Sequence, residues 1–254
     1  MKIISKMARK IVKKLSKEQK SLLIGLLIGD GTISNNYVFK LSHSILQKEY
    51  LEWKIQLLDK YKIKNNGLKG YTSTCGFNKG KGVIYSQLSI NPTIKALRRS
   101  IYIPKKTITR KLLNWLTPQE IAIWYMDDGC INVNTSKQRS SIQHTIKIAT
   151  CVDLEVAEMI IKYFKEIWNI NFRTFKEGSG TFSLASSNEE DCKNFIKIIK
   201  PYILQVPSLL YKIRKDFTKE QFIALQNEDS EARDISEYIF WNDDIVELIS
   251  KDIR

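Results

Sequence analysis

The chain has 254 residues, of which 43% are hydrophobic and 10% aromatic, as in a folded globular protein with room for one large domain or two smaller ones. The net charge of +14 and the pI near 9.5 favour a polyanionic partner, most simply nucleic acid. No apolar run reaches membrane-spanning length, and the basic N-terminus lacks the apolar stretch of a signal peptide, so we expect a soluble, intracellular protein.

The charge is unevenly distributed along the chain. Residues 216–254 contain four Lys/Arg and eleven Asp/Glu, a net charge of −7. The preceding residues 1–215 contain 37 basic and 16 acidic side chains, a net charge of +21. We therefore expect a basic body and a separate acidic extension.

The four cysteines show no C-x-x-C spacing, and the chain has only two histidines, His43 and His144. A structural zinc site is therefore not expected, and neither is a nuclease that uses histidine as its general base. Free thiols in a reducing compartment are the default interpretation.

The first predicted helix follows a basic N-terminal arm. Ser16 and Gln19 form a predicted capping box, and the apolar run after them ends in Gly29-Asp30-Gly31. The elements predicted next are a strand at 37–41, a helix at about 44–63, strands at 67–76 and 83–90, and a helix at 92–100.

The same order recurs after a second capped helix. Thr117, Pro118 and Glu120 begin that helix, which ends in Asp127-Asp128-Gly129. The elements predicted after it are strands at 131–134 and 141–150, a helix at 153–168, strands at 170–176 and 180–186, and a helix at 187–200. We therefore predict an α+β fold of two pseudo-symmetric αββαββα repeats whose antiparallel sheets form a saddle.

Acidic residues at the C-terminal end of a helix oppose the helix dipole, so a cation must compensate, and a bound metal ion is the obvious candidate. Gly25 and Gly29 lie on one stripe of the first motif helix, which indicates close packing against another backbone. If that backbone is the second motif helix, Asp30 and Asp128 meet beneath both sheets. Two carboxylates so placed suit Mg²⁺ and metal-assisted phosphodiester hydrolysis.

The predicted strands carry a polar face as well as an apolar one. In the strand at 141–150, Ile142, Ile146 and Ile148 alternate with polar residues, and His144 falls on the apolar side as a packed residue. A sheet face rich in Lys, Arg, Gln, Asn and Tyr fits a DNA major groove. The candidate DNA-binding residues are Lys40, Lys69, Tyr71, Lys79, Lys81, Tyr85, Gln87, Lys105, Asn132, Asn134, Lys137, Arg139, Gln143, Lys147, Arg173 and Lys176.

The motifs L-I-G-L-L-I-G-D-G (23–31) and I-A-I-W-Y-M-D-D-G (121–129) resemble the paired motifs of LAGLIDADG homing endonucleases of the monomeric, two-repeat, intron-encoded subclass. The resemblance extends to P-K-K-T-I (104–108) and L-Y-K-I (210–213) and covers about residues 18–215. It implies a first repeat at 18–105 and a linker with the second repeat at 106–215, between the basic arm (1–17) and the acidic extension (216–254).

The resemblance also implies roles for individual residues. Asp30 and Asp128 would be catalytic and would bind the metals, with Gly29 and Asp127 at the paired positions before them as further candidates for the metal site. Asp127 is expected to play a supporting role. One catalytic lysine per repeat maps onto Lys106 and Lys212, and Lys105 could exchange roles with Lys106. The cofactor would be Mg²⁺, with Mn²⁺ as a substitute.

The activity implied is cleavage of both strands of a long double-stranded DNA site by a monomer, with short 3′ overhangs. Two alternatives use the same scaffold: a maturase that binds intron RNA, and a catalytically inactive DNA-binding regulator. A reverse transcriptase is disfavoured because the Asp-Asp motif follows a capped helix, and an intein is not expected because the splice-junction residues are missing.

Overall fold

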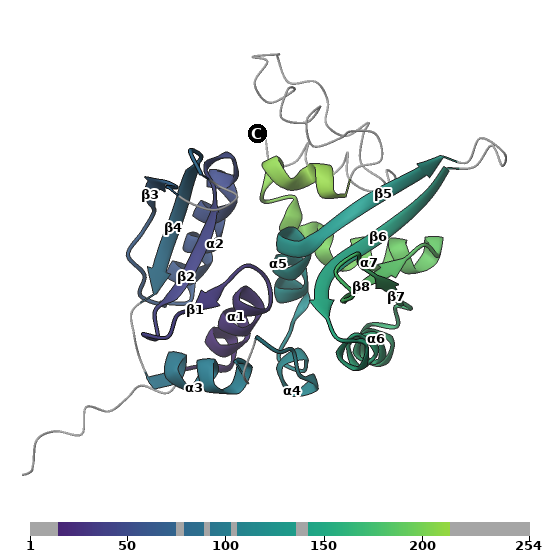
Figure 1. Cartoon of the computed structure of the whole chain (residues 1–254), viewed down its shortest axis with the longest axis horizontal. Helices are drawn as coiled ribbons and strands as arrows, with labels where there is room; N and C mark the ends of the chain where they lie inside the picture. Colours follow the sequence, from purple (N-terminus) through teal and green to yellow (C-terminus); the bar gives the residue numbers. More distant parts are fainter. Residues whose placement is uncertain (1–14, 75–78, 89–91, 103–105, 136–141, 214–254) are drawn as a thin grey trace, which may run out of the picture.

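The computed structural model describes residues 15–74, 79–88, 92–102, 106–135 and 142–213. Two units with the same order of elements follow one another along the chain (Figure 1). The first comprises α1 (Lys17–Ile28), β1 (Thr32–Ile33), β2 (Phe39–Ser44), α2 (Lys48–Lys60), β3 (Lys69–Thr72), β4 (Gly82–Leu88) and α3 (Pro92–Ile101). The second comprises α5 (Pro118–Asp128), β5 (Gly129–Thr135), β6 (Ile142–Val152), α6 (Leu154–Trp168), β7 (Arg173–Lys176), β8 (Phe182–Ser186) and α7 (Glu189–Ile203). The predicted α+β class and αββαββα repeat are confirmed.

Among the described residues, four short elements were not predicted, of which the first is the two-residue strand β1 (Thr32–Ile33). The helix expected from 44 begins with a 3₁₀ turn, η1 (Ile45–Gln47), before α2. A single helical turn, α4 (Arg110–Leu113), lies between the repeats, and the 3₁₀ segment η3 (Pro207–Lys212) follows α7. The strand expected at 37–41 begins only at Phe39, as β2, because Tyr37 has a φ of 60° in a turn. In that turn the Tyr37 N–H donates to the Ser34 carbonyl.

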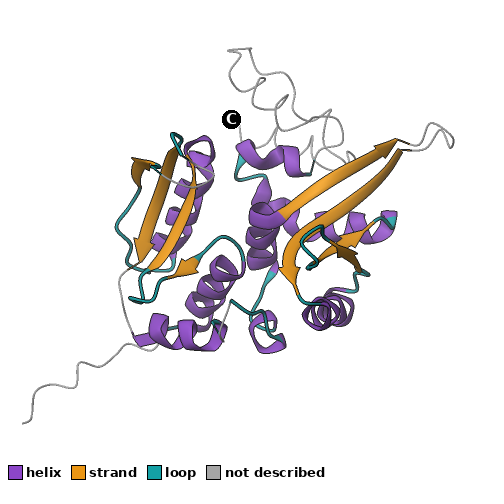
Figure 2. Ribbon diagram, in the orientation of Figure 1, coloured by secondary structure: helices purple, strands orange, loops and turns teal. Residues whose placement is uncertain are grey.

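The two sheets are antiparallel and have equivalent strand orders, β1-β2-β4-β3 and β5-β6-β8-β7. They stand on either side of the motif helices α1 and α5 (Figure 2). Helix α2 packs against the first sheet, and α6 and α7 against the second. This shared topology is the structural form of the repeat seen in the sequence.

Both predicted capping boxes form. Ser16 Oγ accepts the Gln19 N–H at 3.1 Å, and Gln19 Oε1 accepts the Ser16 N–H at 2.9 Å. In the second, Glu120 Oε2 accepts the Thr117 N–H at 3.0 Å. The helices that follow are almost wholly buried in one hydrophobic core shared by the two repeats. Among the described residues, no helix is both long and apolar enough to cross a lipid bilayer.

Candidate metal centre and nucleic-acid interface

The two motif helices pack where Gly25 and Gly29 replace side chains. A Cβ on Gly25 would lie 2.4 Å from Glu120 Cγ, and a Cβ on Gly29 would lie 2.0 Å from Asp127 Oδ2. Glu120 Oε2 also accepts a hydrogen bond from Ser21 of α1 at 2.7 Å, so the residue that caps α5 joins the helices as well. The packing of α1 on α5 deduced from the glycine stripe is therefore present.

Asp30 and Asp128 lie near each other at the C-terminal ends of α1 and α5. Burial and then the negative charges of Asp127 and Asp30 raise the pKa of Asp128 to about 7. Burial and then the charge of Asp127 likewise raise the pKa of Asp30. The two repeats thus bring carboxylates together so closely that a cation is needed to keep them all ionised.

Lys106 and Lys212 occupy matching places at the two helix ends. Lys106 Nζ donates to the Gly29 carbonyl at 2.5 Å, and Lys212 Nζ donates to the Met126 and Asp127 carbonyls at 2.5 and 3.0 Å. Each lysine therefore binds the main chain directly before its repeat's aspartate. Burial lowers the pKa of both lysines, and the nearby aspartates oppose this. The two ammonium groups supply part of the cationic compensation that a helix ending in acids requires.

Asp127 has an environment unlike that of Asp128. Its side chain is fully buried, and its Oδ1 accepts hydrogen bonds from Lys54 Nζ at 2.6 Å and Tyr50 Oη at 2.8 Å. Its Oδ2 accepts the Asp30 N–H at 3.0 Å. Although burial opposes ionisation, the charge of Lys54 lowers the pKa of Asp127. The carboxylate is thus already bonded within the protein.

His43, Tyr50, Lys54 and Asp127 form what we call the buried cluster, and sequence reasoning missed the first three as site residues. His43 Nε2 lies 3.1 Å from Lys54 Nζ, and its Nδ1 lies 3.7 Å from Asp30 Oδ2. The signal was present, because His43 continues the buried alternation of Phe39 and Leu41 in β2. Lys54 similarly falls in the buried stripe of α2.

The residues at the helix ends fit a divalent cation. Asp30 has 44% of its side chain exposed, so its carboxylate is accessible. Within the described residues, the Asp128 carboxylate has no hydrogen-bond or ion-pair partner. Oxygen donors of this kind are those that Mg²⁺ binds, together with water and phosphate oxygens. Ligand atoms of Asp30, His43 and Asp127 also lie within 4.8 Å of one another, but His43 Nε2 and Asp127 Oδ1 face Lys54.

The first sheet brings several predicted DNA-binding residues onto one face. Register pairs Lys40 with Gln87 and Lys69 with Tyr85, placing all four on the face opposite α2 together with Tyr71. The Lys40 ammonium lies 5.1 Å from the Tyr71 ring and 4.6 Å from the Tyr85 ring. Lys79 and Lys81 are exposed between β3 and β4.

The second sheet presents an equivalent face. Its register aligns the positions of Asn132, Asn134, Gln143, Lys147 and Arg173 on one side. Lys147 Nζ is engaged there with Glu177 at 2.9 Å and lies 4.0 Å from the Phe175 ring centroid. Lys176 falls on the other side by register, in line with Thr174. The candidates that lie outside the described residues are Lys105, Lys137 and Arg139.

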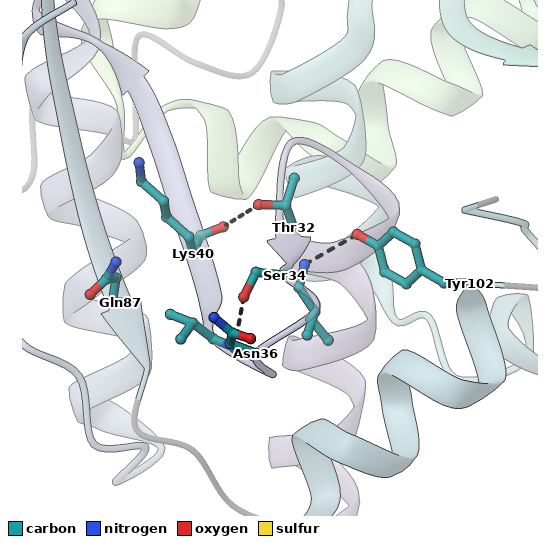
Figure 3. A pocket seen from close by; sticks show the side chains of 8 residues that line it. Thr32, Ser34, Asn36, Lys40, Gln87 and Tyr102 are labelled. Atoms are coloured by element: carbon teal, nitrogen blue, oxygen red, sulfur yellow. Dashed lines mark hydrogen bonds between the residues drawn. The ribbon is translucent and has the colours of Figure 1, made fainter. Parts of the chain in front are cut away.

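An open cavity of about 460 Å³ borders the polar face of the first sheet, at the β1–β2 turn (Figure 3). Lys40 and Gln87 line it from the strands, and Thr32 Oγ1 donates to the Lys40 carbonyl at 3.5 Å. Tyr102 closes the opposite side by accepting the Ile33 N–H at 3.1 Å. The cavity is an extension of the polar face and is separate from the carboxylates.

The paired motif helices and the repeated sheets can be compared with known proteins. The sequence profile of the LAGLIDADG DNA endonuclease family matches residues 20–195. This chain belongs to that family. In the solved structure of the homing endonuclease I-WcaI bound to its DNA recognition sequence, the similar fold covers 79% of this chain and 87% of I-WcaI, with a TM-score of 0.65 and 21% identity.

Curated relatives of this LAGLIDADG chain have several names. Protein RecA of Mycobacterium shimoidei is 28% identical over 80% of this chain and 48% of that protein, so the chain spans about half the length of this relative. DNA endonuclease I-ChuI of Chlamydomonas applanata is 24% identical over 78% of this chain and 95% of I-ChuI. Cytochrome b mRNA maturase bI2 of Saccharomyces cerevisiae is 26% identical over 76% of this chain and 46% of the maturase.

Proposed function

We propose that this chain is a monomeric, divalent-metal-dependent, site-specific endonuclease that hydrolyses one phosphodiester in each strand of a long double-stranded DNA site. The observation that carries the proposal is that Asp30 and Asp128 converge, and that a lysine ammonium group binds the main-chain carbonyl directly before each aspartate. Family membership and the similarity to DNA endonuclease I-ChuI support it.

Asp30 and Asp128 would hold the metal, with Mg²⁺ as the expected ion and Mn²⁺ as a substitute. When bound, such an ion activates a water molecule and stabilises charge on the phosphate oxygens. Asp127 would act as a supporting residue, because its oxygens already accept bonds from Lys54, Tyr50 and the Asp30 N–H. The Gly29 carbonyl is similarly engaged by Lys106.

Lys106 and Lys212 would each serve one strand. Because burial lowers their pKa values, each ammonium can more readily exchange a proton with the attacking water or leaving oxygen. While charged, each can also stabilise the extra negative charge of the transition state. The position of each lysine on the carbonyl before its aspartate keeps these groups close to the reacting phosphate.

The polar faces of the two sheets would read the major groove on either side of the cleavage positions. On the first sheet the Lys40 ammonium lies over the rings of Tyr71 and Tyr85, and Asn132 and Arg173 lie on the polar face of the second sheet. The cuts would then fall across the minor groove and leave short 3′ overhangs. Because lysine and arginine contacts release counterions from DNA, affinity should fall steeply with salt.

The test is a cleavage selection on a randomised duplex library in Mg²⁺, with sequencing of the cut ends. The proposal predicts one enriched long site, two cuts per molecule and 3′ overhangs, and no cleavage in EDTA. Failure to enrich a cleaved site would contradict it.

A maturase activity on intron RNA is the second candidate, favoured by the similarity to maturase bI2. Filter binding to the RNA of the intron that encodes the chain, with and without excess target DNA, separates the two. An inactive DNA-binding regulator is less favoured, because both acids and both lysines are present and correctly grouped.

A further inference from the structure

Asp30 is contacted by the buried cluster through both its main chain and its side chain. Its N–H donates to Asp127 Oδ2 at 3.0 Å, and its own Oδ2 lies 3.7 Å from His43 Nδ1. Lys54 joins these two contacts, because its ammonium binds Asp127 at 2.6 Å and faces His43 Nε2 at 3.1 Å. The cluster therefore forms a closed path from the backbone of Asp30 to its carboxylate.

The partners of His43 define which ring nitrogen carries the proton. An ammonium group has three donors and no lone pair, so Lys54 must donate to Nε2. Because Nε2 accepts this bond, it carries no proton, so the ring is neutral and its proton is on Nδ1. His43 consequently presents an N–H donor toward Asp30, and no lone pair with which to bind a metal.

Among the residues that the structure describes, the second repeat has no such cluster around Asp128. Gly29 occupies in the first motif the position that Asp127 occupies in the second. Because glycine has no side chain, it offers no carboxylate to accept a hydrogen bond from the Asp128 N–H. Strand β6 has a register shift between Ile148 and Val152, in the region that corresponds to His43. Residues 148–152 include no histidine, and Thr150 Oγ1 in this region donates to the Phe182 carbonyl at 2.9 Å. The counterpart of Lys54 in the buried stripe of α6 is Ile160, which is fully buried.

We propose that the buried cluster is a positioning device for Asp30 alone, so that the two strand cuts depend on it unequally. His43 and Lys54 are positioning residues in this proposal, since they act through Asp30. The proposal rests on the proposed function, because it concerns the two hydrolysis steps of one double-strand cut. It adds that a change in the cluster converts the protein toward a nicking enzyme with a fixed strand preference.

The first test measures both strands separately, on the selected target with a different fluorophore at each 5′ end, under single-turnover conditions in Mg²⁺. We expect His43→Gln to slow one strand by about 10- to 100-fold, as is typical for residues that orient metal ligands, while the other strand remains near the wild-type rate. DNA affinity should be unchanged, and nicked duplex should accumulate.

Two matched variants control for general loosening. Thr150→Val changes the corresponding region of β6 in the second repeat, and Leu51→Ala weakens the packing of the same helix as Lys54 at a residue that is not a member of the cluster. Both should leave the ratio of the two strand rates unchanged. Equal slowing of both strands in His43→Gln, or no slowing of either, would overturn the proposal.

A second test does not require cleavage. The chain has only two histidines, so ¹⁵N-detected imidazole spectra can be assigned with His43→Gln. We expect a neutral Nδ1–H ring whose proton signal shifts in Asp30→Asn and stays in place in Asp128→Asn. An Nε2–H ring, or an equal response to both variants, would overturn the proposal even if the wild type cut no DNA, whereas absence of cleavage alone would count only against the proposed function.

Discussion

Lys54 and Asp127 form an ion pair between the two repeats, with 2.6 Å between Nζ and Oδ1 and both side chains fully buried. Lys54 comes from α2 of the first repeat and Asp127 from α5 of the second. Asp127 fits there because Gly29 leaves the space that a side chain would fill. Asp127 is thus accommodated by a glycine and neutralised by a lysine.

Removing one member of this pair should be strongly destabilising. Lys54→Met leaves a buried carboxylate without its cation, and we expect a loss of about 3–5 kcal/mol in the free energy of unfolding. The double variant Lys54→Met with Asp127→Asn removes both charges and should recover most of that loss. Urea unfolding of the wild type, the two single variants and the double variant measures the coupling. Additive effects would show that the pair has no energetic role.

The contact between α1 and α5 predicts a sharp requirement for glycine. In Gly29→Ala the new methyl group would overlap the Asp127 carboxylate, and overpacking of this kind costs about 1–3 kcal/mol. Gly178→Ala is the matched control, because a Cβ there meets no atom within 4 Å. Thermal unfolding should show a lower Tm for the first variant only. An unchanged Tm in Gly29→Ala would contradict the packing described.

Lys106→Ala and Lys212→Ala should slow cleavage by on the order of 100-fold or more, the usual contribution of a positioned proton-transfer group. DNA affinity should change less, because the sheet faces supply most phosphate and base contacts. Rapid-quench cleavage and fluorescence-anisotropy binding on the same duplex separate the two effects. Exposed Lys111 provides a control, since Lys111→Ala should alter neither. Wild-type cleavage rates in both active-site variants would show that these lysines are spectators.

The pKa of Asp128 predicts a pH dependence. The value is raised from 3.8 to about 7, so the folded protein binds a proton that the unfolded chain has released. In EDTA, Asp128 should therefore destabilise the wild type increasingly between these two pH values, and fully above the higher one. Asp128→Asn should remove that dependence, and Mg²⁺ should oppose it by favouring the ionised carboxylate. Calorimetry across this range checks the sign, and a wild type that gains stability relative to Asp128→Asn would contradict it.

The motif helices could be predicted from sequence because their signals are local. Ser16 with Gln19, and Thr117 with Glu120, mark where each helix begins, and Gly25 and Gly29 mark the contact between them. Asp30 and Asp128 followed from the motif itself. Lys106 and Lys212 could be assigned only through the family resemblance. Each lies about 80 residues along the chain from the main-chain carbonyl that it binds, which belongs to the residue before the aspartate.

The buried cluster could not be read in the same way. Tyr50 and Lys54 come from a helix of the first repeat and bind Asp127 of the second, 77 and 73 residues away. His43 comes from a strand of the first repeat and joins them through Lys54. A lysine on an amphipathic helix can be solvated or buried. Only the contact of Lys54 in α2 with Asp127 in α5 shows which partner this lysine binds. The second sheet shows the same limit, since Arg173 and Lys176 were both candidate DNA-binding residues and register places them on opposite faces.

The most direct test of the central claim is strand cleavage by Asp30→Asn and Asp128→Asn. Each variant keeps the size and hydrogen-bonding shape of the side chain but removes the charge that would hold the metal. On the selected target in Mg²⁺, both variants should bind DNA, as followed by anisotropy. Neither variant should make double-strand cuts. Full double-strand cleavage by either variant would contradict the assignment of these two aspartates as the metal-binding centre.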